Sequence, residues 1–265
     1  MGIVYERRRA FKRLGLDYKP LTVVYPRYQI GNWLKGYSAV LDPPLMNHLI
    51  HVVETEQLTN QPPPSFTIDE PFNKLLHQVG LKQVESIPVK HCRNAFGYQV
   101  ETLEGFRLVY SGDTMPCDSL VLAGRNCDLL IHEATFGDDL KEEAVSKKHS
   151  TISDAIDVGR RMMAKATILT HFSQRYETIP HLTGEMVSYF KKHNVGIAFD
   201  NMLVGPGQFK ALPGMVPVLI EMFADKLGQL EEIQQKRNLR KEREMAGLSS
   251  VVDSVKKGKQ QKKNK

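Results

Sequence analysis

The sequence lacks several features that would place the chain in a membrane or outside the cell. It has no run of about eighteen consecutive apolar residues, the length that a membrane-spanning helix requires. Residues 1–7 contain no apolar core of the kind found in secretory signals. Its three cysteines, at positions 92, 117 and 127, are odd in number and irregularly spaced. We therefore expect no disulfide framework, a reducing compartment, no membrane contact and no secretion.

Net positive charge is confined to one end of the chain. Residues 235–265 hold eleven Lys or Arg and three Asp or Glu, which is a net charge of +8. Because the whole chain has a net charge of +6, the rest of the chain sums to −2. Such a tail suits nucleic-acid binding or nuclear import, and a solvated, disordered end fits it equally well. We predict a charged C-terminal helix over 216–246 and a basic, disordered tail over 247–265.

Apolar and β-branched runs alternate with amphipathic segments, which predicts an α/β fold. A hairpin is expected from residues 98–102 and 106–110 around a turn that contains Gly105. The other predicted strands are 21–25, 127–131, 166–169 and 195–199. The predicted helices are 3–14, 151–163 and 183–193, with Ser150 or Thr151 capping the second of them. Residues 57–68 have the composition of a polar loop, and the chain shows no internal repeat.

Polar side chains follow three of the predicted strands at the point where each strand ends. The segments are Gly112-Asp113-Thr114, His132-Glu133-Ala134-Thr135 and Thr170-His171-Phe172-Ser173-Gln174-Arg175-Tyr176. In α/β proteins, the carboxyl ends of the strands meet at the crevice where ligands bind. Because all three junctions contain an acid or a histidine, we favour a functional site over ordinary turn residues.

Two more histidines lie near these junctions in the sequence. His91 precedes the predicted hairpin, and His149 stands at the start of the 151–163 helix. Imidazoles and a carboxylate are the usual zinc ligands at hydrolytic sites. An aspartate between two metals can bridge them, and a pair of close divalent ions suits phosphodiester cleavage.

These motifs occur in the same order in one known family. The sequence resembles ribonuclease Z, the tRNA 3′-processing endonuclease of the metallo-β-lactamase fold, over roughly residues 86–205. The resemblance rests on five segments, which are the His91 segment ending in Phe96-Gly97-Tyr98, Ser111-Gly112-Asp113-Thr114, His132-Glu133-Ala134-Thr135, His149-Ser150-Thr151 and the His171 segment. It implies an αβ/βα sandwich and looks like the catalytic half of the long, eukaryotic form. Residues 1–215 would then be a partial domain, incomplete at its N-terminal side.

The resemblance also implies a role for each site residue. His91 would bind one zinc, His171 the other, and Asp113 would bridge the two ions. Glu133 would pair with His149 and orient it, as carboxylates commonly do for imidazoles. His149 would then act as an acid on the scissile phosphate or its leaving oxygen.

The implied substrate is precursor tRNA, and the implied reaction removes its 3′ trailer and leaves a 3′-hydroxyl. Arg175 would bind a phosphate, for which the planar guanidinium is well suited. The implied cofactor is zinc, with two ions in an intact site. The expected compartment is the nucleus, the mitochondrion or both, with the cytosol as the other candidate.

One signature of the family is missing. No His-x-His-x-Asp-His loop, which supplies four metal ligands, occurs in the 265 residues, and Met1-Gly2-Ile3 resembles the junction that follows it. We therefore expect a chain truncated after this loop, with a partial ligand set. Each zinc would keep two protein ligands where catalytic zinc normally has three, so the isolated chain should be inactive. An exposed sheet edge and apolar surface would favour aggregation or a partner, such as a second copy in a homodimer.

Two alternatives stay open. The chain could be a catalytically dead RNA-binding or regulatory protein that keeps Arg175, or a hydrolase of another phosphodiester, a thioester or a lactam.

Other candidate residues fit structural roles better. His132 alternates to the opposite strand face from Glu133. His48 and His51 could share a helix face, which alone is a weak metal motif. His181 and His193 look like surface positions, and Cys92 and Cys117 fall outside the ligand set.

Overall fold

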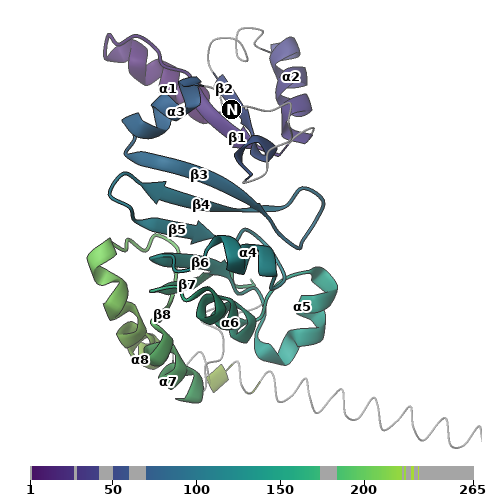
Figure 1. The fold of residues 1–265 in the computed structure, drawn as a ribbon, viewed down its shortest axis with the longest axis vertical. Helices are drawn as coiled ribbons and strands as arrows, with labels where there is room; N and C mark the ends of the chain where they lie inside the picture. The colour runs from purple at the N-terminus through teal and green to yellow at the C-terminus, as the bar shows by residue number, and fades with distance from the viewer. Residues whose placement is uncertain are drawn as a thin grey trace, which may run out of the picture.

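A six-stranded sheet in the order β3-β4-β5-β6-β7-β8 is the centre of the computed structural model (Figure 1). The structure describes residues 2–26, 29–41, 50–59, 70–173 and 184–222, together with 224, 228, 229 and 232. The strands are β3 (Leu81–Pro88), β4 (Phe96–Thr102), β5 (Arg107–Tyr110), β6 (Leu129–Glu133), β7 (Thr167–Thr170) and β8 (Val195–Ile197). The first three strands are antiparallel, and β5 to β8 are parallel. The predicted α/β class is confirmed.

The predicted hairpin is formed by β4 and β5. Tyr98 pairs with Tyr110 and Glu101 with Arg107, and Gly105 in the turn has a φ of 85°, a conformation that glycine adopts readily. This hairpin brings the chain into the parallel part of the sheet, where the polar junctions lie.

Helices α4 (Asp118–Ala123) and α6 (Ile152–Met162) cover one face of the sheet. Helix α6 begins at the N-cap Thr151, whose hydroxyl accepts a hydrogen bond from the Asp154 amide at 3.3 Å. Its apolar side packs on β5 and β6 in a core cluster of Ile87, Val109, Cys117, Leu120, Val121, Cys127, Leu130, Val158 and Met162. This core fixes the strands that carry the site.

Helices α7 (Gly184–His193) and α8 (Leu212–Met222) pack beside β8 at one end of the molecule (Figure 1). The sheet face opposite α4 and α6 carries an apolar groove of about 400 Å³. It is lined by Phe106, Leu108, Leu129, Ile131, Ile168, Thr170, Ala198, Phe199, Met202, Val204 and Phe209. The groove agrees with the apolar surface that the sequence analysis expects.

A βαβ unit precedes the sheet and lies at the other end of the molecule (Figure 1). Its elements are α1 (Gly2–Arg13), β1 (Leu21–Tyr25), α2 (Gln29–Leu41) and β2 (Ile50–Glu54), and β1 and β2 pair in parallel. A 3₁₀ turn, η2 (Thr55–Leu58), and α3 (Glu70–Gln78) connect it to β3. The main-chain oxygen of Thr55 accepts a 2.6 Å hydrogen bond from the Ser86 hydroxyl, which ties the unit to the sheet.

The structure corrects some of the expectations. His51 lies in strand β2, with its Nδ1 3.4 Å from the Thr22 hydroxyl, so the helix face that the His48–His51 spacing would allow does not form at His51. His48 and His181 lie outside the described residues, as does the tail over 247–265. Strand β6 continues through Glu133, so His132 and Glu133 belong to the strand itself.

Several helices differ from or add to the predicted set. Of the charged C-terminal helix expected over 216–246, the structure describes residues 216–222 as the end of α8, which already begins at Leu212 and contains Pro217, and most of the later residues lie outside the described part of the chain. Helices α2, α3, α4 and α5 (Lys141–Lys147) and the 3₁₀ turns η3 (Asp138–Leu140) and η4 (Pro206–Ala211) were not predicted. None of the helices that the structure describes is long and apolar enough to cross a membrane.

Candidate metal centre

The polar junctions meet at the carboxyl ends of three neighbouring strands. Parallel pairing of β5 with β6 and of β6 with β7 places Asp113, Glu133 and His171 at one edge of the sheet. Two loops complete the cluster, since His91 lies between β3 and β4 and His149 between α5 and α6. The structure therefore brings together the five of the six predicted site residues that it describes. Arg175 lies outside the described residues.

A tight turn after β5 carries Asp113. Gly112 has a φ of 60°, and a Cβ there would lie 2.6 Å from the main-chain oxygen of Phe96, so both conformation and space require glycine. The Ser111 hydroxyl donates to the Gly112 carbonyl at 2.6 Å and accepts from the Glu133 amide at 3.0 Å. This serine fixes the ends of β5 and β6 relative to each other.

Glu133 is a buried carboxylate that accepts hydrogen bonds on both oxygens. Only 1% of the residue is exposed. Its Oε1 accepts from the Thr114 amide at 2.7 Å and from His149 Nδ1 at 2.7 Å. Its Oε2 accepts from the Thr135 hydroxyl at 2.6 Å and from the amides of Thr135 and Ser150, each at 3.2 Å. A buried carboxylate needs such donors, because desolvation without them is costly.

These bonds define the orientation of two imidazoles. Because an ionised carboxylate only accepts, Nδ1 of His149 carries the proton of that bond and Nε2 stays available. The Thr135 hydroxyl gives its proton to Glu133, so it accepts from Nδ1 of His171 at 2.8 Å. Glu133 thus orients His149 directly and His171 through Thr135.

His91 is oriented in a similar way from another loop. Its Nδ1 lies 2.9 Å from the main-chain oxygen of Lys148, which can only accept, so Nε2 of His91 also stays available. The three imidazole rings lie close together, with centroids 4.7 Å apart for His91 and His149 and 5.7 Å apart for His149 and His171. Hydrogen bonds of this kind are typical of histidines that bind metals.

Two sets of side chains can each hold a metal ion. The ligand atoms of His91, Asp113 and His149 lie within 4.8 Å of one another, and so do those of Glu133, His149 and His171. Asp113 Oδ1 is also 3.6 Å from Nε2 of His171, so the aspartate lies between His91 and His171. His149 occurs in both sets, whereas the sequence assigns it no metal.

Charge near the cluster also affects other groups. Burial raises the pKa of Tyr110, and the carboxylates of Asp113 and Glu133 raise it further. The carboxylates therefore create a negative potential at this edge, which favours a cation.

The remaining candidates lie apart from the cluster. His132 is fully buried, and its Nδ1 lies 2.6 Å from the main-chain oxygen of Glu133. This position agrees with its predicted structural role. Cys92 is exposed and Cys117 is buried, and neither belongs to either set of possible ligands.

Thr114, Thr135 and Ser150, which hold Glu133, were not predicted to belong to the site. All three stand inside the quoted motifs, next to residues that were assigned. Their ability to donate hydrogen bonds was the feature of the sequence that could have pointed to this role. Only the fold shows which of their atoms face the Glu133 carboxylate.

Comparison with known proteins agrees with the fold and the motifs. The Beta-lactamase superfamily domain matches residues 44–172. The chain is 39% identical over 254 residues to "Zinc phosphodiesterase ELAC protein 2" of Rattus norvegicus, covering 96% of the chain and 30% of that protein. It is 36% identical to "Ribonuclease Z, mitochondrial" of Drosophila melanogaster, covering 92% of the chain and 30% of that protein.

A solved structure leads to the same group. The crystal structure of a long form RNase Z from yeast superposes with a TM-score of 0.67 at 26% identity, covering 82% of this chain and 32% of that one. The chain spans only about 30% of the length of these relatives. The resemblance found in the sequence motifs is confirmed: residues 44–172 match a metallo-β-lactamase-type domain, and over most of its length the chain is similar to one part of ribonuclease Z proteins.

Proposed function

We propose that this chain provides part of the two-zinc centre of an endoribonuclease that removes the 3′ trailer from precursor tRNA. The observation that carries the proposal is the cluster of His91, Asp113, Glu133, His149 and His171 at the carboxyl ends of β5 to β7. The names of two relatives, a zinc phosphodiesterase and a ribonuclease Z, support the same reaction.

The donor set fits zinc. Imidazole nitrogen and carboxylate oxygen are ordinary zinc ligands, and the hydrogen bonds of His91 and His171 leave Nε2 of each ring available. In our proposal His91 and His171 each hold one ion, and Asp113 bridges them. When bound, zinc supplies polarisation of the phosphodiester and a water that ionises near neutral pH.

His149 has a different proposed role, because Glu133 already holds its Nδ1. The protonated ring would donate its Nε2 proton to the leaving 3′ oxygen of the tRNA, which yields the 3′-hydroxyl. Glu133 acts through this ring as a positioning residue. Arg175 would bind a phosphate of the substrate.

Trailer cleavage tests the proposal. The assay uses a precursor tRNA with a 3′ trailer, zinc, and this chain with and without any in-frame upstream segment that contains a His-x-His-x-Asp-His loop. We expect cleavage only with that loop, and a loss of about 10²–10⁴-fold for His149→Ala. His193→Ala is the matched control, since His193 lies outside both sets of possible metal ligands. Equal rates for Arg175→Ala and the unchanged protein would contradict the role of Arg175.

A catalytically dead RNA-binding protein is the second candidate, favoured by the absence of the His-x-His-x-Asp-His motif from the 265 residues. Equilibrium dialysis with zinc discriminates between the two. Two tightly bound ions per chain would argue against a dead protein.

A mitochondrial relative supports a mitochondrial location for this chain, while nuclear location and a homodimer stay predictions.

A further inference from the structure

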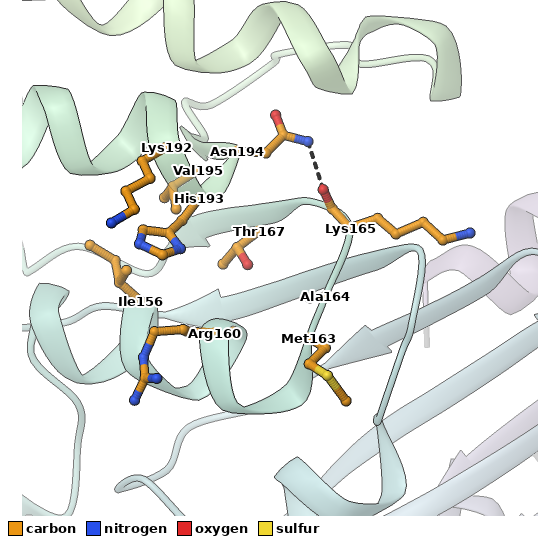
Figure 2. A pocket seen from close by; sticks show the side chains of 11 residues that line it. Ile156, Arg160, Met163, Ala164, Lys165, Thr167, Lys192, His193, Asn194 and Val195 are labelled. Carbon is orange, nitrogen blue, oxygen red and sulfur yellow. Dashed lines mark hydrogen bonds between the residues drawn. The ribbon is translucent and has the colours of Figure 1, made fainter.

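Two of the three cations that line one surface pocket have partners within the molecule, and the third, Lys192, is exposed. A pocket of about 280 Å³ lies between the last turns of α6 and α7. Arg160 pairs with Asp157 at 2.7 Å, and Lys165 pairs with Asp128 at 2.7 Å. Figure 2 shows the Lys165 side chain pointing away from the others that line the pocket. Neutralised cations of this kind offer little attraction to an anion.

Helix α1 differs in this respect. Arg8, Lys12 and Arg13 are exposed, and no ion pair is found for them among the residues that the structure describes. Arg9 pairs with Glu6 at 2.8 Å, but both side chains are mostly exposed. The helix therefore presents a concentrated positive charge, although the chain outside its basic tail is slightly negative.

The packing of α1 leaves these cations exposed. Val4 is buried in a core cluster with Tyr25, Leu34 and Ile50. At 100° per residue, Arg9 and Arg13 point away from Val4, whereas Arg8 and Lys12 lie toward its side of the helix, about 40° and 80° from it. Arg8 and Lys12 are four residues apart, as are Arg9 and Arg13, and like charges at this spacing destabilise a helix. A bound polyanion would turn this repulsion into attraction.

Arg7 has a structural role beside this face. Its guanidinium lies 4.7 Å from the ring centroid of Phe11, and its Nε donates to the main-chain oxygen of Lys19 at 3.4 Å. These contacts hold the segment after the helix against α1, and the exposed Lys19 adds a further cation to this region.

We propose that the exposed basic surface of α1, defined by Arg8, Arg9, Lys12 and Arg13, binds the phosphate backbone of RNA without reading its sequence. Exposed cations on a helix match the negative charge of that backbone. The choice of RNA rests on the proposed function, since the substrate there is precursor tRNA. An anionic membrane is the competing partner, because Ile3, Leu14 and Leu16 are exposed at and just after α1, although Val4 is buried and Phe11 contacts Tyr18. RNA is preferred because of the proposed function, and vesicle binding is an outcome of the test.

The test measures binding of the full chain to a precursor tRNA transcript at several salt concentrations. The variant carries Arg8→Gln, Lys12→Gln and Arg13→Gln. Its matched control carries Lys191→Gln, Lys192→Gln and Lys210→Gln, three exposed lysines elsewhere, so both variants lose the same net charge. Circular dichroism checks that both variants fold.

We expect the α1 variant to bind roughly ten-fold more weakly, with a log–log salt slope shallower by about 2, because each phosphate contact contributes about 0.7–0.9. The control should bind like the unchanged chain. The comparison is repeated in chains whose lysines at 256, 257, 259, 262, 263 and 265 are changed to Gln, so that tail binding cannot mask the effect.

Three results would overturn the inference. The first is that the α1 variant and the control bind the transcript with equal affinity in both backgrounds. The second is that the unchanged chain does not bind the transcript. The third is that α1 is required for association with phosphatidylserine vesicles but not with RNA. The first and third results leave trailer cleavage unaffected, so the inference can fail while the proposed function stands. The second result counts against both, and trailer cleavage by the upstream-extended chain then decides the proposed function.

Discussion

The Nδ1 of His149 lies 2.7 Å from Oε1 of Glu133, a carboxylate that is almost completely buried. The same carboxylate reaches His171 through the Thr135 hydroxyl. Two imidazoles of the candidate centre therefore depend on one acid at the end of β6.

Changing Glu133 to Gln should destabilise the fold. The amide group would face main-chain donors that now meet a carboxylate oxygen, and each buried donor left unpaired costs about 1–3 kcal/mol. We expect the free energy of unfolding in urea to fall by about 2 kcal/mol or more. Glu143→Gln, which removes an exposed pair with Lys147, should change it by less than about 1 kcal/mol. A similar fall in the free energy of unfolding for the two variants would contradict the role of Glu133 as the shared acceptor of these hydrogen bonds.

Thr135 should control zinc affinity through the tautomer of His171. Thr135→Val removes the hydroxyl that accepts from Nδ1, and changes of this kind typically weaken metal binding about 10–100-fold. Thr135→Ser keeps the hydroxyl and should retain most of the affinity. Zinc titration with ¹⁵N NMR of the imidazole nitrogens would measure both effects. If the valine variant kept both its affinity and the Nδ1–H tautomer, the bridge through Thr135 would be disproved.

Stability should decrease in mild acid because of His132. Burial lowers its pKa below the ordinary 6.5, and its Nε2 has no hydrogen-bond partner among the residues that the structure describes. The unfolded chain takes up a proton near pH 6.5 while the folded chain does not, so the free energy of unfolding falls as pH drops through that value. The slope from this residue can reach about 1.4 kcal/mol per pH unit.

Urea unfolding between pH 8 and 5 would measure this slope. We expect His132→Gln to have a shallower slope than the unchanged chain. His77→Gln is the comparison, because His77 is exposed. A slope that did not change on removing His132 would count against the explanation.

Among the thiols, only Cys92 should react quickly. It is exposed, whereas Cys117 and Cys127 are buried, and burial raises the pKa of Cys127 to about 11. Because the thiolate is the nucleophile, iodoacetamide at pH 7.5 should label one site in the folded chain and three after unfolding. Mass spectrometry of the labelled peptides gives the result, and fast labelling of Cys127 in the folded chain would contradict its packing.

The sequence predicts the region around the candidate centre better than the N-terminal region. The alternation of apolar residues identified the hairpin and the strands that end at Asp113, Glu133 and His171, because period and end chemistry agree there. In a parallel sheet, the carboxyl ends of neighbouring strands lie at the same edge, so the residues that follow these strands come together.

Other parts depended on contacts that no local pattern contains. The His48–His51 spacing suggested a helix, but pairing of β2 with β1 placed His51 in a strand. The roles of Thr135 and Ser150 follow from bonds to Glu133, which is distant in sequence from Ser150. The short helices α4 and α5 contain too few residues for a clear helical period.

Strand β6 places consecutive residues on opposite faces. Leu130 belongs to the cluster under α4 and α6, His132 shares its side, and Leu129 and Ile131 line the groove on Glu133's side. A one-residue insertion or deletion within 129–133 would exchange the two sets, sending the acid into the core and the imidazole to the metal edge. The register of β6 is therefore constrained by chemistry as well as by packing. Insertions and deletions should be tolerated only outside this strand, as in the turn at 103–105.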